Sequence, residues 1–163
     1  MKKSAGIIAY VVVEGVPHFL LGLPGGPFYC NYDKEGNVVS YKDETHKWSI
    51  LKGGIDKGET KKEAALREFR EESGFSLDDR KKELISLDYI KYKSGKRVYA
   101  YGIKAFFDVT KMKSNNCQME YKGQVREFPE ICKYKYMTLE EARRYCNKSQ
   151  FELIERLNES IKS

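Results

Sequence analysis

Residues 53–75 read GGIDKGETKKEAALREFREESGF, and three glutamates, Glu68, Glu71 and Glu72, stand close together near the end of this stretch. On a helix with about 100° per residue, Glu71 lies about 60° to one side of Glu68 and Glu72 about 40° to the other. All three carboxylates therefore project from one face. Leu66 and Phe69 point to the opposite face, where they would anchor the helix on a hydrophobic core.

The helix that carries these glutamates has clear ends. Thr60 and Glu63 fit a capping box at its start, and Gly74 is placed to end it about four turns later. Ala64 and Ala65 share the glutamate face, and we expect their small side chains to leave room for a bulky group to approach.

Three carboxylates on one face repel one another and raise one another's pKa unless a cation compensates. Arg67 precedes Glu71 by four residues and can pair with it, but one arginine cannot neutralise all three. Oxygen ligands on a rigid helix suit Mg²⁺ or Mn²⁺. Taken alone, however, a segment such as EFREE is more typical of a solvated, ion-paired helix face.

The residues upstream of the glutamates favour the metal site. Seven fixed identities and two apolar positions match one known pattern at its full spacing, and such a match would arise by accident with odds on the order of 10⁻⁷. The matching positions are Gly53, Glu59, Arg67, Glu68, Phe69, Glu71, Glu72, Gly74 and Phe75. On these residues the chain resembles the Nudix (MutT-like) hydrolases. The resemblance implies an α/β (α+β) fold, an α/β/α sandwich with a mixed central sheet.

The resemblance extends over nearly the whole chain. The flanking segments look like a branch of bacterial predicted nucleotide pyrophosphohydrolases, and the layout is similar to that of asymmetric diadenosine tetraphosphate hydrolases. These segments are SAGIIAY (4–10), LPGGPF (23–28), KWSILKGGIDKGE (47–59), EFPE (127–130) and LEEARRY (139–145).

The resemblance also implies roles for the residues of the motif. Glu68, Glu71 and Glu72 would be metal ligands for Mg²⁺ or Mn²⁺, and the backbone carbonyl of Lys52 or Gly53 would add another. Arg67 would orient a helix carboxylate and belongs to the catalytic set with Glu68 and Glu72.

Family members often supply one more glutamate from a loop before a late strand. Glu130 is the first choice for this residue and Glu127 the second. Which glutamate acts as the general base stays open.

Substrate contacts are harder to read from the sequence. Lys96 and Arg97 follow a turn and would hold outer phosphates, although lysines in turns are often only solvated. Tyr99 lies in a predicted strand, where its ring could stack on a base or simply pack. Lys52, directly before the motif, completes the expected substrate-binding set.

Composition limits the class of protein. The chain has 163 residues, 40% of them hydrophobic and 33% charged, so we expect one domain over residues 1–163. No apolar run approaches the roughly 18 residues of a membrane span. The net charge of +6 favours an anionic ligand or a lysine-rich surface. The four cysteines form no C-x-x-C pair, which favours reduced thiols in a cytoplasmic protein.

The remaining pattern predicts strands around the helix and further helices at the end. We expect a hairpin over 4–13 and 18–23, an irregular loop over 24–46, a strand over 47–51 and a second hairpin over 83–92 and 97–109. A polar stretch over 110–127, a strand in KYKYM (133–137) and helices near 138–147 and 150–160 follow.

The expected activity is metal-dependent hydrolysis of a nucleoside diphosphate linked to another moiety, with nucleoside or dinucleoside polyphosphates as substrates. Three alternatives stay open: a diphosphoinositol polyphosphate hydrolase, a pyrophosphatase that removes oxidised nucleotides, and a non-catalytic nucleotide- or RNA-binding module. We expect a small-molecule substrate, no nucleic-acid or membrane partner, and a monomer or a homodimer.

Overall fold

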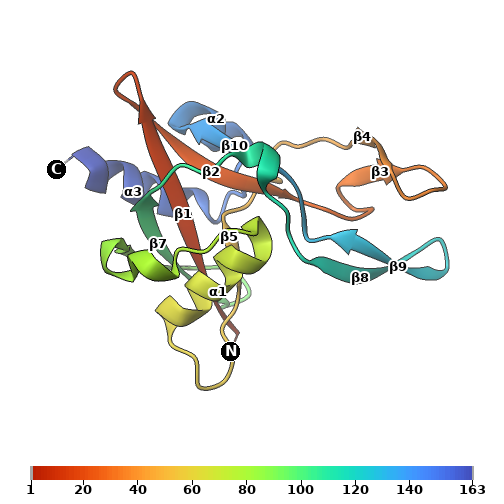
Figure 1. Ribbon diagram of the computed structural model, residues 1–163, viewed down its shortest axis with the longest axis horizontal. Helices are drawn as coiled ribbons and strands as arrows, with labels where there is room; N and C mark the ends of the chain where they lie inside the picture. Colours follow the sequence, from red (N-terminus) through yellow and green to blue (C-terminus); the bar gives the residue numbers. More distant parts are fainter. Residues whose placement is uncertain (1, 163) are drawn as a thin grey trace.

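A six-stranded mixed sheet organises the computed structural model, which describes residues 2–162. Its strand order is β10-β2-β1-β7-β6, and β5 pairs with β1 outside this path (Figure 1). Only β1 and β7 run parallel; the other pairs are antiparallel. The strands are β1 (Lys3–Val13), β2 (Val16–Pro24), β5 (Leu51–Gly54), β6 (Ile85–Lys91), β7 (Arg97–Lys104) and β10 (Ile131–Thr138).

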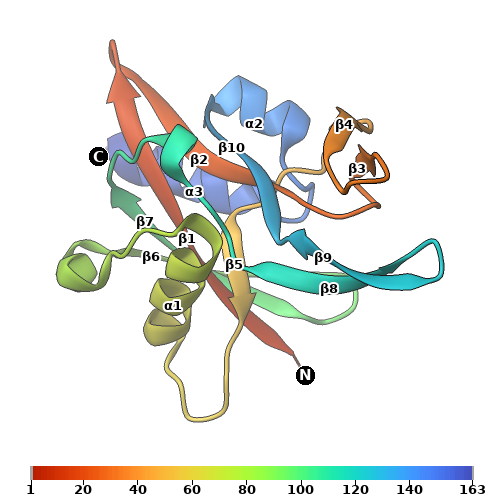
Figure 2. The same cartoon turned by 45° about the vertical axis from the view of Figure 1, so that its right-hand side comes forward.

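Helices cover both faces of this sheet. Along β1, Ala5, Ile7 and Ala9 contribute to the core beneath α1 (Lys61–Ser73), while Ile8 and Tyr10 contribute to the core beneath α2 (Leu139–Tyr145) and α3 (Phe151–Lys162). Side chains alternate between the faces of a strand, so a strand buried on both sides reads as an apolar run. Figure 2 shows α1 on one side of the sheet and α2 and α3 on the other. The predicted α/β/α arrangement is confirmed.

Helix α1 begins and ends where the sequence predicts. The Thr60 hydroxyl accepts the Glu63 N–H at 3.1 Å, and the Glu63 carboxylate accepts the Thr60 N–H at 2.8 Å. Gly74 adopts φ 81°, a left-handed conformation that glycine tolerates without strain.

The prediction for the two alanines of α1 is wrong. Ala64 and Ala65 are fully buried in the core against the sheet and leave no opening for a ligand. Their small side chains instead let the helix lie close to β1 and β5. Leu66 and Phe69 are buried as predicted. The buried surface of α1 therefore includes the two alanines as well as the face opposite the glutamates.

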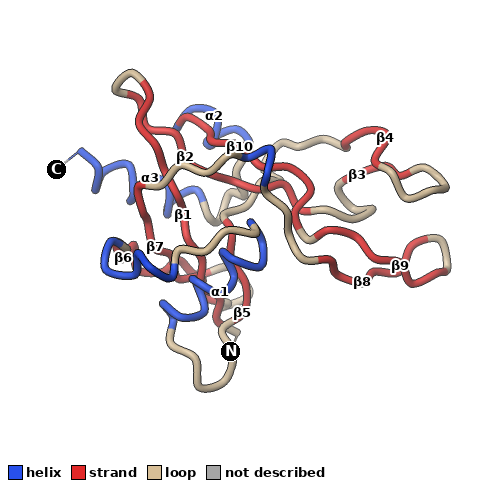
Figure 3. Tube along the Cα trace, viewed as in Figure 1, coloured by secondary structure: helices blue, strands red, loops and turns tan. Residues whose placement is uncertain are grey.

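Two small hairpins project from the sheet, and we call them the arm. They are β3 (Cys30–Tyr32) with β4 (Val38–Tyr41) and β8 (Asn116–Tyr121) with β9 (Gln124–Pro129). Figure 3 shows the two hairpins extending in the same direction. A third, separate cluster of buried side chains, Cys30, Tyr32 and Phe128, lies between them.

The arm corrects two predictions. The predicted irregular loop (24–46) and polar stretch (110–127) both contain strands. Their strands are short and most of their side chains are exposed, so the sequence lacks the apolar repeat that identifies a core strand.

Other boundaries shift by a few residues. The strand predicted over 47–51 begins at Leu51, and Trp48 and Ser49 form only isolated bridges, with Cys146 and Gly22. The predicted second hairpin exists as β6 and β7, but its second strand ends at Lys104. Within residues 2–162, no helix has the length and apolar character needed to cross a membrane.

Candidate active site

Arg67 connects the loop after β5 to the carboxylates of α1. Its Nε donates to Glu59 at 2.8 Å, and its Nη1 donates to Glu68 at 2.8 Å and to Glu71 at 2.9 Å. Its Nη2 donates to the Gly54 carbonyl at 2.8 Å. These carboxylates, Glu59 first, raise the pKa of the Arg67 guanidinium above its ordinary value. Arg67 therefore carries a permanent charge that fixes the positions of three acidic side chains.

Glu72 is the most buried carboxylate of the set, with 7% of the residue exposed. Its Oε1 accepts the backbone N–H of Lys52 at 3.0 Å, and the Tyr134 hydroxyl donates to the Glu72 backbone carbonyl. Burial raises the pKa of Glu72 to about 8; the charges of Glu68 and Glu130 add to this effect and Lys52 opposes it. Glu72 is thus a buried acid without an ion-pair partner in residues 2–162.

Glu68 lies against the backbone of β5. A Cβ added to Gly53 would lie 2.1–2.3 Å from the Glu68 carboxylate atoms, so a side chain here would force the Glu68 carboxylate to move. Burial raises the pKa of Glu68, the neighbouring Glu71 and Glu130 raise it further, and Arg67 lowers it.

A chain of backbone hydrogen bonds brings Glu130 to this site from the other end of the sequence. The Asn115 N–H donates to the Glu71 carbonyl at 2.8 Å, and the Glu130 N–H donates to the Asn115 carbonyl at 2.9 Å. The Gly25 N–H in turn donates to the Glu130 carbonyl at 2.9 Å. Burial and then the charge of Glu71 raise the pKa of Glu130. Glu127, the second choice, is exposed in β9, so the structure brings Glu130 to the cluster and not Glu127.

Two residues that support the site were missed from the sequence. Asn115 links α1 to Glu130, and Tyr134 contacts the end of α1 through its hydroxyl. The segment KYKYM did contain a usable signal, because alternation along a strand places Tyr134 and Tyr136 on the same face. No local pattern indicates the partner of Asn115.

A pocket of about 280 Å³ adjoins the carboxylates. It lies where the sheet meets the arm, and its lining contains both polar and apolar residues. The polar residues include Lys52, Glu72 and Glu130, and the apolar residues include Tyr29, Cys117 and Met119.

Lys96 lies close to Lys52, and both belong to the expected substrate-binding set. Burial lowers the pKa of Lys96, and the charges of Lys52 and Lys2 lower it further. Lys96 also lines a cavity of about 540 Å³ with Lys2 and Lys3. In the described part of the chain, none of these four ammonium groups forms an ion pair.

Arg97 and Tyr99 lie on β7 and are engaged with neighbouring side chains. The Arg97 guanidinium lies 4.7 Å from the centre of the Tyr89 ring. The Tyr99 ring is 6% exposed, with the Lys61 ammonium 4.1 Å from its centre and the Tyr89 ring 5.2 Å away. A base contact at Tyr99 therefore stays a prediction, and in this structure its ring packs.

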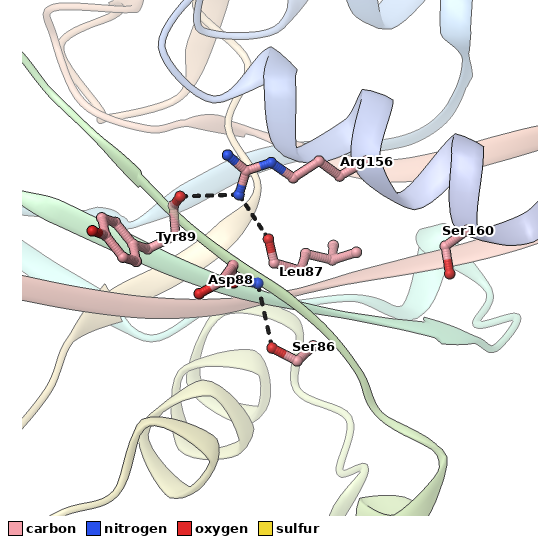
Figure 4. A pocket seen from close by; sticks show the side chains of 6 residues that line it. All are labelled: Ser86, Leu87, Asp88, Tyr89, Arg156 and Ser160. Carbon is pink, nitrogen blue, oxygen red and sulfur yellow. Dashed lines mark hydrogen bonds between the residues drawn. The ribbon is translucent and has the colours of Figure 1, made fainter.

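Another cavity, of about 470 Å³, lies between β6 and α3 and contains none of the motif residues. Figure 4 shows Arg156 reaching from α3 to the edge strand, where its Nη1 donates to the carbonyls of Leu87 and Tyr89 at 2.8 and 2.9 Å. Asp88, between them, has φ 64° at a register shift of the strand. Arg156 thus ties α3 to the edge strand at its register shift, which is a structural role.

The acidic side chains fit a divalent metal ion by their chemistry. They offer hard carboxylate oxygens, Glu72 forms no ion pair with any described residue, and the absence of a side chain at Gly53 leaves the carboxylate of Glu68 against the backbone. Their arrangement is not a preformed cage, however. Among residues 2–162, no three acidic, histidine or cysteine side chains converge as a metal-binding group.

Comparison with known proteins identifies the family. The family model described as NUDIX domain matches residues 31–157. The RNA pyrophosphohydrolase of Nitratiruptor sp. is 40% identical over 76 residues, 44% of this chain and 48% of that protein. The RNA pyrophosphohydrolase of Tolumonas auensis is 37% identical over 80 residues, 48% of this chain and 45% of that protein. The chain thus spans about half the length of the curated relatives it matches.

Solved structures resemble the fold over more of the chain. A binary complex of the C. elegans Ap4A hydrolase has a TM-score of 0.61 at 19% identity and covers 99% of this chain and 98% of that one. The NUDIX domain of Shewanella oneidensis NrtR, complexed with ADP ribose, has a TM-score of 0.62 at 11% identity, with 98% and 87% covered. At these identities the likeness concerns the fold.

Proposed function

The chain belongs to the Nudix family, and from this premise we propose that it hydrolyses a phosphoanhydride bond in a nucleoside diphosphate linked to another moiety. The observation that carries the proposal is Glu72, a buried carboxylate that forms no ion pair among the described residues, beside Glu68 and Glu130. Burying an unpaired acid destabilises a fold, so a ligand that compensates its charge is the physical reason to retain it.

Glu68, Glu71 and Glu72, with the Gly53 carbonyl, would hold Mg²⁺ or Mn²⁺. When bound, such an ion neutralises phosphate charge and lowers the pKa of water at the scissile bond. Arg67 holds Glu68 and Glu71 in place, because its Nη1 donates to both carboxylates.

Proton transfer is assigned to Glu130. Its carboxylate lines the pocket, and its raised pKa suits a group that must take a proton from water near neutral pH. Glu68, whose pKa is raised in the same direction, is the other candidate.

Lysines beside the carboxylates provide the complementary charge for phosphate groups. Lys52 adjoins both the pocket and Lys96, so phosphates on either side of the scissile bond would meet a positive charge. The apolar lining residues of the pocket, which include Tyr29 and Met119, suit the nucleoside. Arg97 would contribute charge farther along β7.

Two substrate classes have separate support. The likeness to the C. elegans Ap4A hydrolase over the full chain supports dinucleoside polyphosphates. The curated RNA pyrophosphohydrolases, similar over about half their length, support the 5′-phosphorylated end of an RNA. Both substrates present a phosphoanhydride chain attached to a nucleoside, and we place the enzyme in the cytoplasm, where both occur.

A substrate panel tests the proposal. Product release is measured with and without Mg²⁺ on dinucleoside tetraphosphates, nucleoside triphosphates including oxidised ones, 5′-triphosphorylated RNA, sugar nucleotides and diphosphoinositol polyphosphates. Glu72→Gln serves as the inactive control. Metal-dependent turnover of at least one nucleotide substrate is expected, whereas nucleotide or RNA binding without turnover of any substrate contradicts the proposal.

A further inference from the structure

Two cysteines meet at the base of the arm. Cys30 begins β3 and Cys132 lies in β10, and their Sγ atoms are 3.5 Å apart although 102 positions separate them in sequence. Both thiols are free. A disulfide has Sγ atoms about 2.05 Å apart, so bond formation needs an approach of about 1.5 Å. The described residues contain no other thiol–thiol contact.

Residues next to both cysteines line the pocket beside the carboxylates. Tyr29, next to Cys30, and Ile131, next to Cys132, both belong to its lining. The Cys132 thiol also donates to the Pro24 carbonyl at 3.5 Å. The cysteine pair therefore lies where the arm meets the wall that carries Glu130.

We propose that Cys30 and Cys132 form a reversible disulfide that fastens the arm to the sheet and fixes the width of the pocket. The proposal concerns the thiols themselves and does not depend on the substrate. The sequence alone favours four independent reduced thiols, because the spacing of the cysteines shows no pair.

The reaction balances with a small-molecule disulfide such as oxidised glutathione as the oxidant. Cys132 is the more exposed of the two thiols and reacts first. Its sulfur attacks the glutathione disulfide, releases one glutathione thiol and forms a mixed disulfide. The Cys30 sulfur then attacks Cys132, and the second glutathione leaves. Two protein thiols lose two electrons in total, and one disulfide oxidant gains them.

Burial sets the conditions for this reaction. Burial raises the pKa of the Cys132 thiol, and the neighbouring Cys30 raises it further, so little thiolate is present near neutral pH. The pair is consequently slow to oxidise, and the disulfide, once formed, is shielded by the aromatic cluster of the arm.

The test is oxidation of the full-length protein with oxidised glutathione, followed by alkylation of the remaining thiols after unfolding, intact mass measurement and peptide mapping. The reduced protein has four free thiols, and we expect two to remain after oxidation, with Cys30 linked to Cys132. Closing a loop of 102 positions is expected to raise the Tm by about 5 °C or more. Hydrogen exchange should slow in residues 24–42 and 116–132.

Variants separate the pair from the other thiols. Cys30→Ser should accumulate the mixed disulfide on Cys132, and Cys132→Ser should retain a reduced Cys30. Cys117→Ser, the matched control for a partly exposed thiol, should still form the bond. Four alkylated thiols in the oxidised wild type, or a bond that involves Cys117 or Cys146, would overturn the proposal. Formation of the bond with unchanged exchange in the arm would overturn its fastening role.

Discussion

The motif helix α1 and the arm are built in different ways. Helix α1 packs on a sheet that is buried on both faces, and Phe69 is fully buried in that core. The arm has its own small cluster, in which Phe128 is 2% exposed, and it contacts the sheet only at its base. The two phenylalanines are almost equally buried, yet one belongs to the main core and the other to a satellite. Burial of a single residue therefore does not indicate how much of the molecule depends on it.

This difference explains where the carboxylates are placed. Holding Glu68 and Glu72 away from water opposes folding, because both carboxylates lose hydration. The packing of a helix on a large core can offset this unfavourable free energy, whereas the small cluster of a projecting hairpin cannot. The arm instead supplies apolar lining residues of the pocket, Cys117 and Met119.

The largest expected effect compares the two phenylalanines directly. Phe69→Ala should lower the global free energy of unfolding by about 3–5 kcal/mol, because it leaves a cavity in the main core. Phe128→Ala should leave the global Tm nearly unchanged and open the arm locally. Denaturant unfolding gives the first quantity, and hydrogen exchange in residues 30–41 and 116–129 gives the second. Equal global losses in the two variants would mean that the arm is not a separate unit.

The second prediction concerns the function of the carboxylates on α1. Glu72→Gln should reduce metal-dependent turnover by about 10²–10³-fold, while the Tm of the metal-free protein stays the same or rises, because an unpaired buried acid is removed. Glu127→Gln on the arm is the matched control and should retain full activity. Near-normal turnover of Glu72→Gln would remove the basis of the proposed site.

The third prediction compares two arginines of α1. Arg67→Ala should lower the free energy of unfolding by about 2 kcal/mol, because Glu59, Glu68 and Glu71 lose their common partner. Arg70→Ala should change it by about 0–1 kcal/mol, since Arg70 is half exposed and its ion pair with Asp78 is on the surface. Thermal melts of both variants measure the difference. A similar effect of the two substitutions would show that Arg67 does not organise the site.

The smallest effect is a pH dependence. Burial raises the pKa of Glu72 to about 8 in the folded protein, whereas its ordinary pKa is 4.5. At a pH between these two values, the folded protein holds a proton that the unfolded chain has released. The stability of the metal-free protein should therefore decrease as the pH rises from about 5 to about 8. Melting curves of the wild type and Glu72→Gln should diverge over this window, with the smaller slope in the variant. Parallel curves would show that Glu72 is ionised throughout.

Much of the central sheet and of α1 could be predicted from the sequence. The apolar run of β1 and the capping residues Thr60 and Gly74 are signals that depend only on residues close together in sequence. Packing of these elements in the sheet and its core agrees with them. The family resemblance carried by residues 53–75 marked Arg67 and the three glutamates as a set, and the structure shows Arg67 hydrogen-bonded to Glu68 and Glu71. The prediction for Ala64 and Ala65 was wrong, because helix geometry gives the direction of a side chain but not the part of the protein that packs against it.

The arm and the contacts across the chain could not be predicted in the same way. Asn115 and Tyr134 act through hydrogen bonds to α1. Strand alternation indicates the face on which Tyr134 lies, but no local pattern indicates the partner of either residue. Glu130 and Glu127 were separable only once the strand bounds placed one beside the helix and the other on an exposed hairpin. The approach of Cys30 to Cys132 likewise arises from the fold.

The most direct test of the central claim is anomalous diffraction from crystals of the protein soaked in Mn²⁺. The account predicts a peak beside α1, with carboxylate oxygens of Glu68 and Glu72 about 2.0–2.3 Å from the ion. The same soak of Glu72→Gln crystals should lose or weaken the peak. An ion bound only at Glu59 and Asp56, or no peak along α1 while other sites are occupied, would contradict the claim that these buried carboxylates form the metal site.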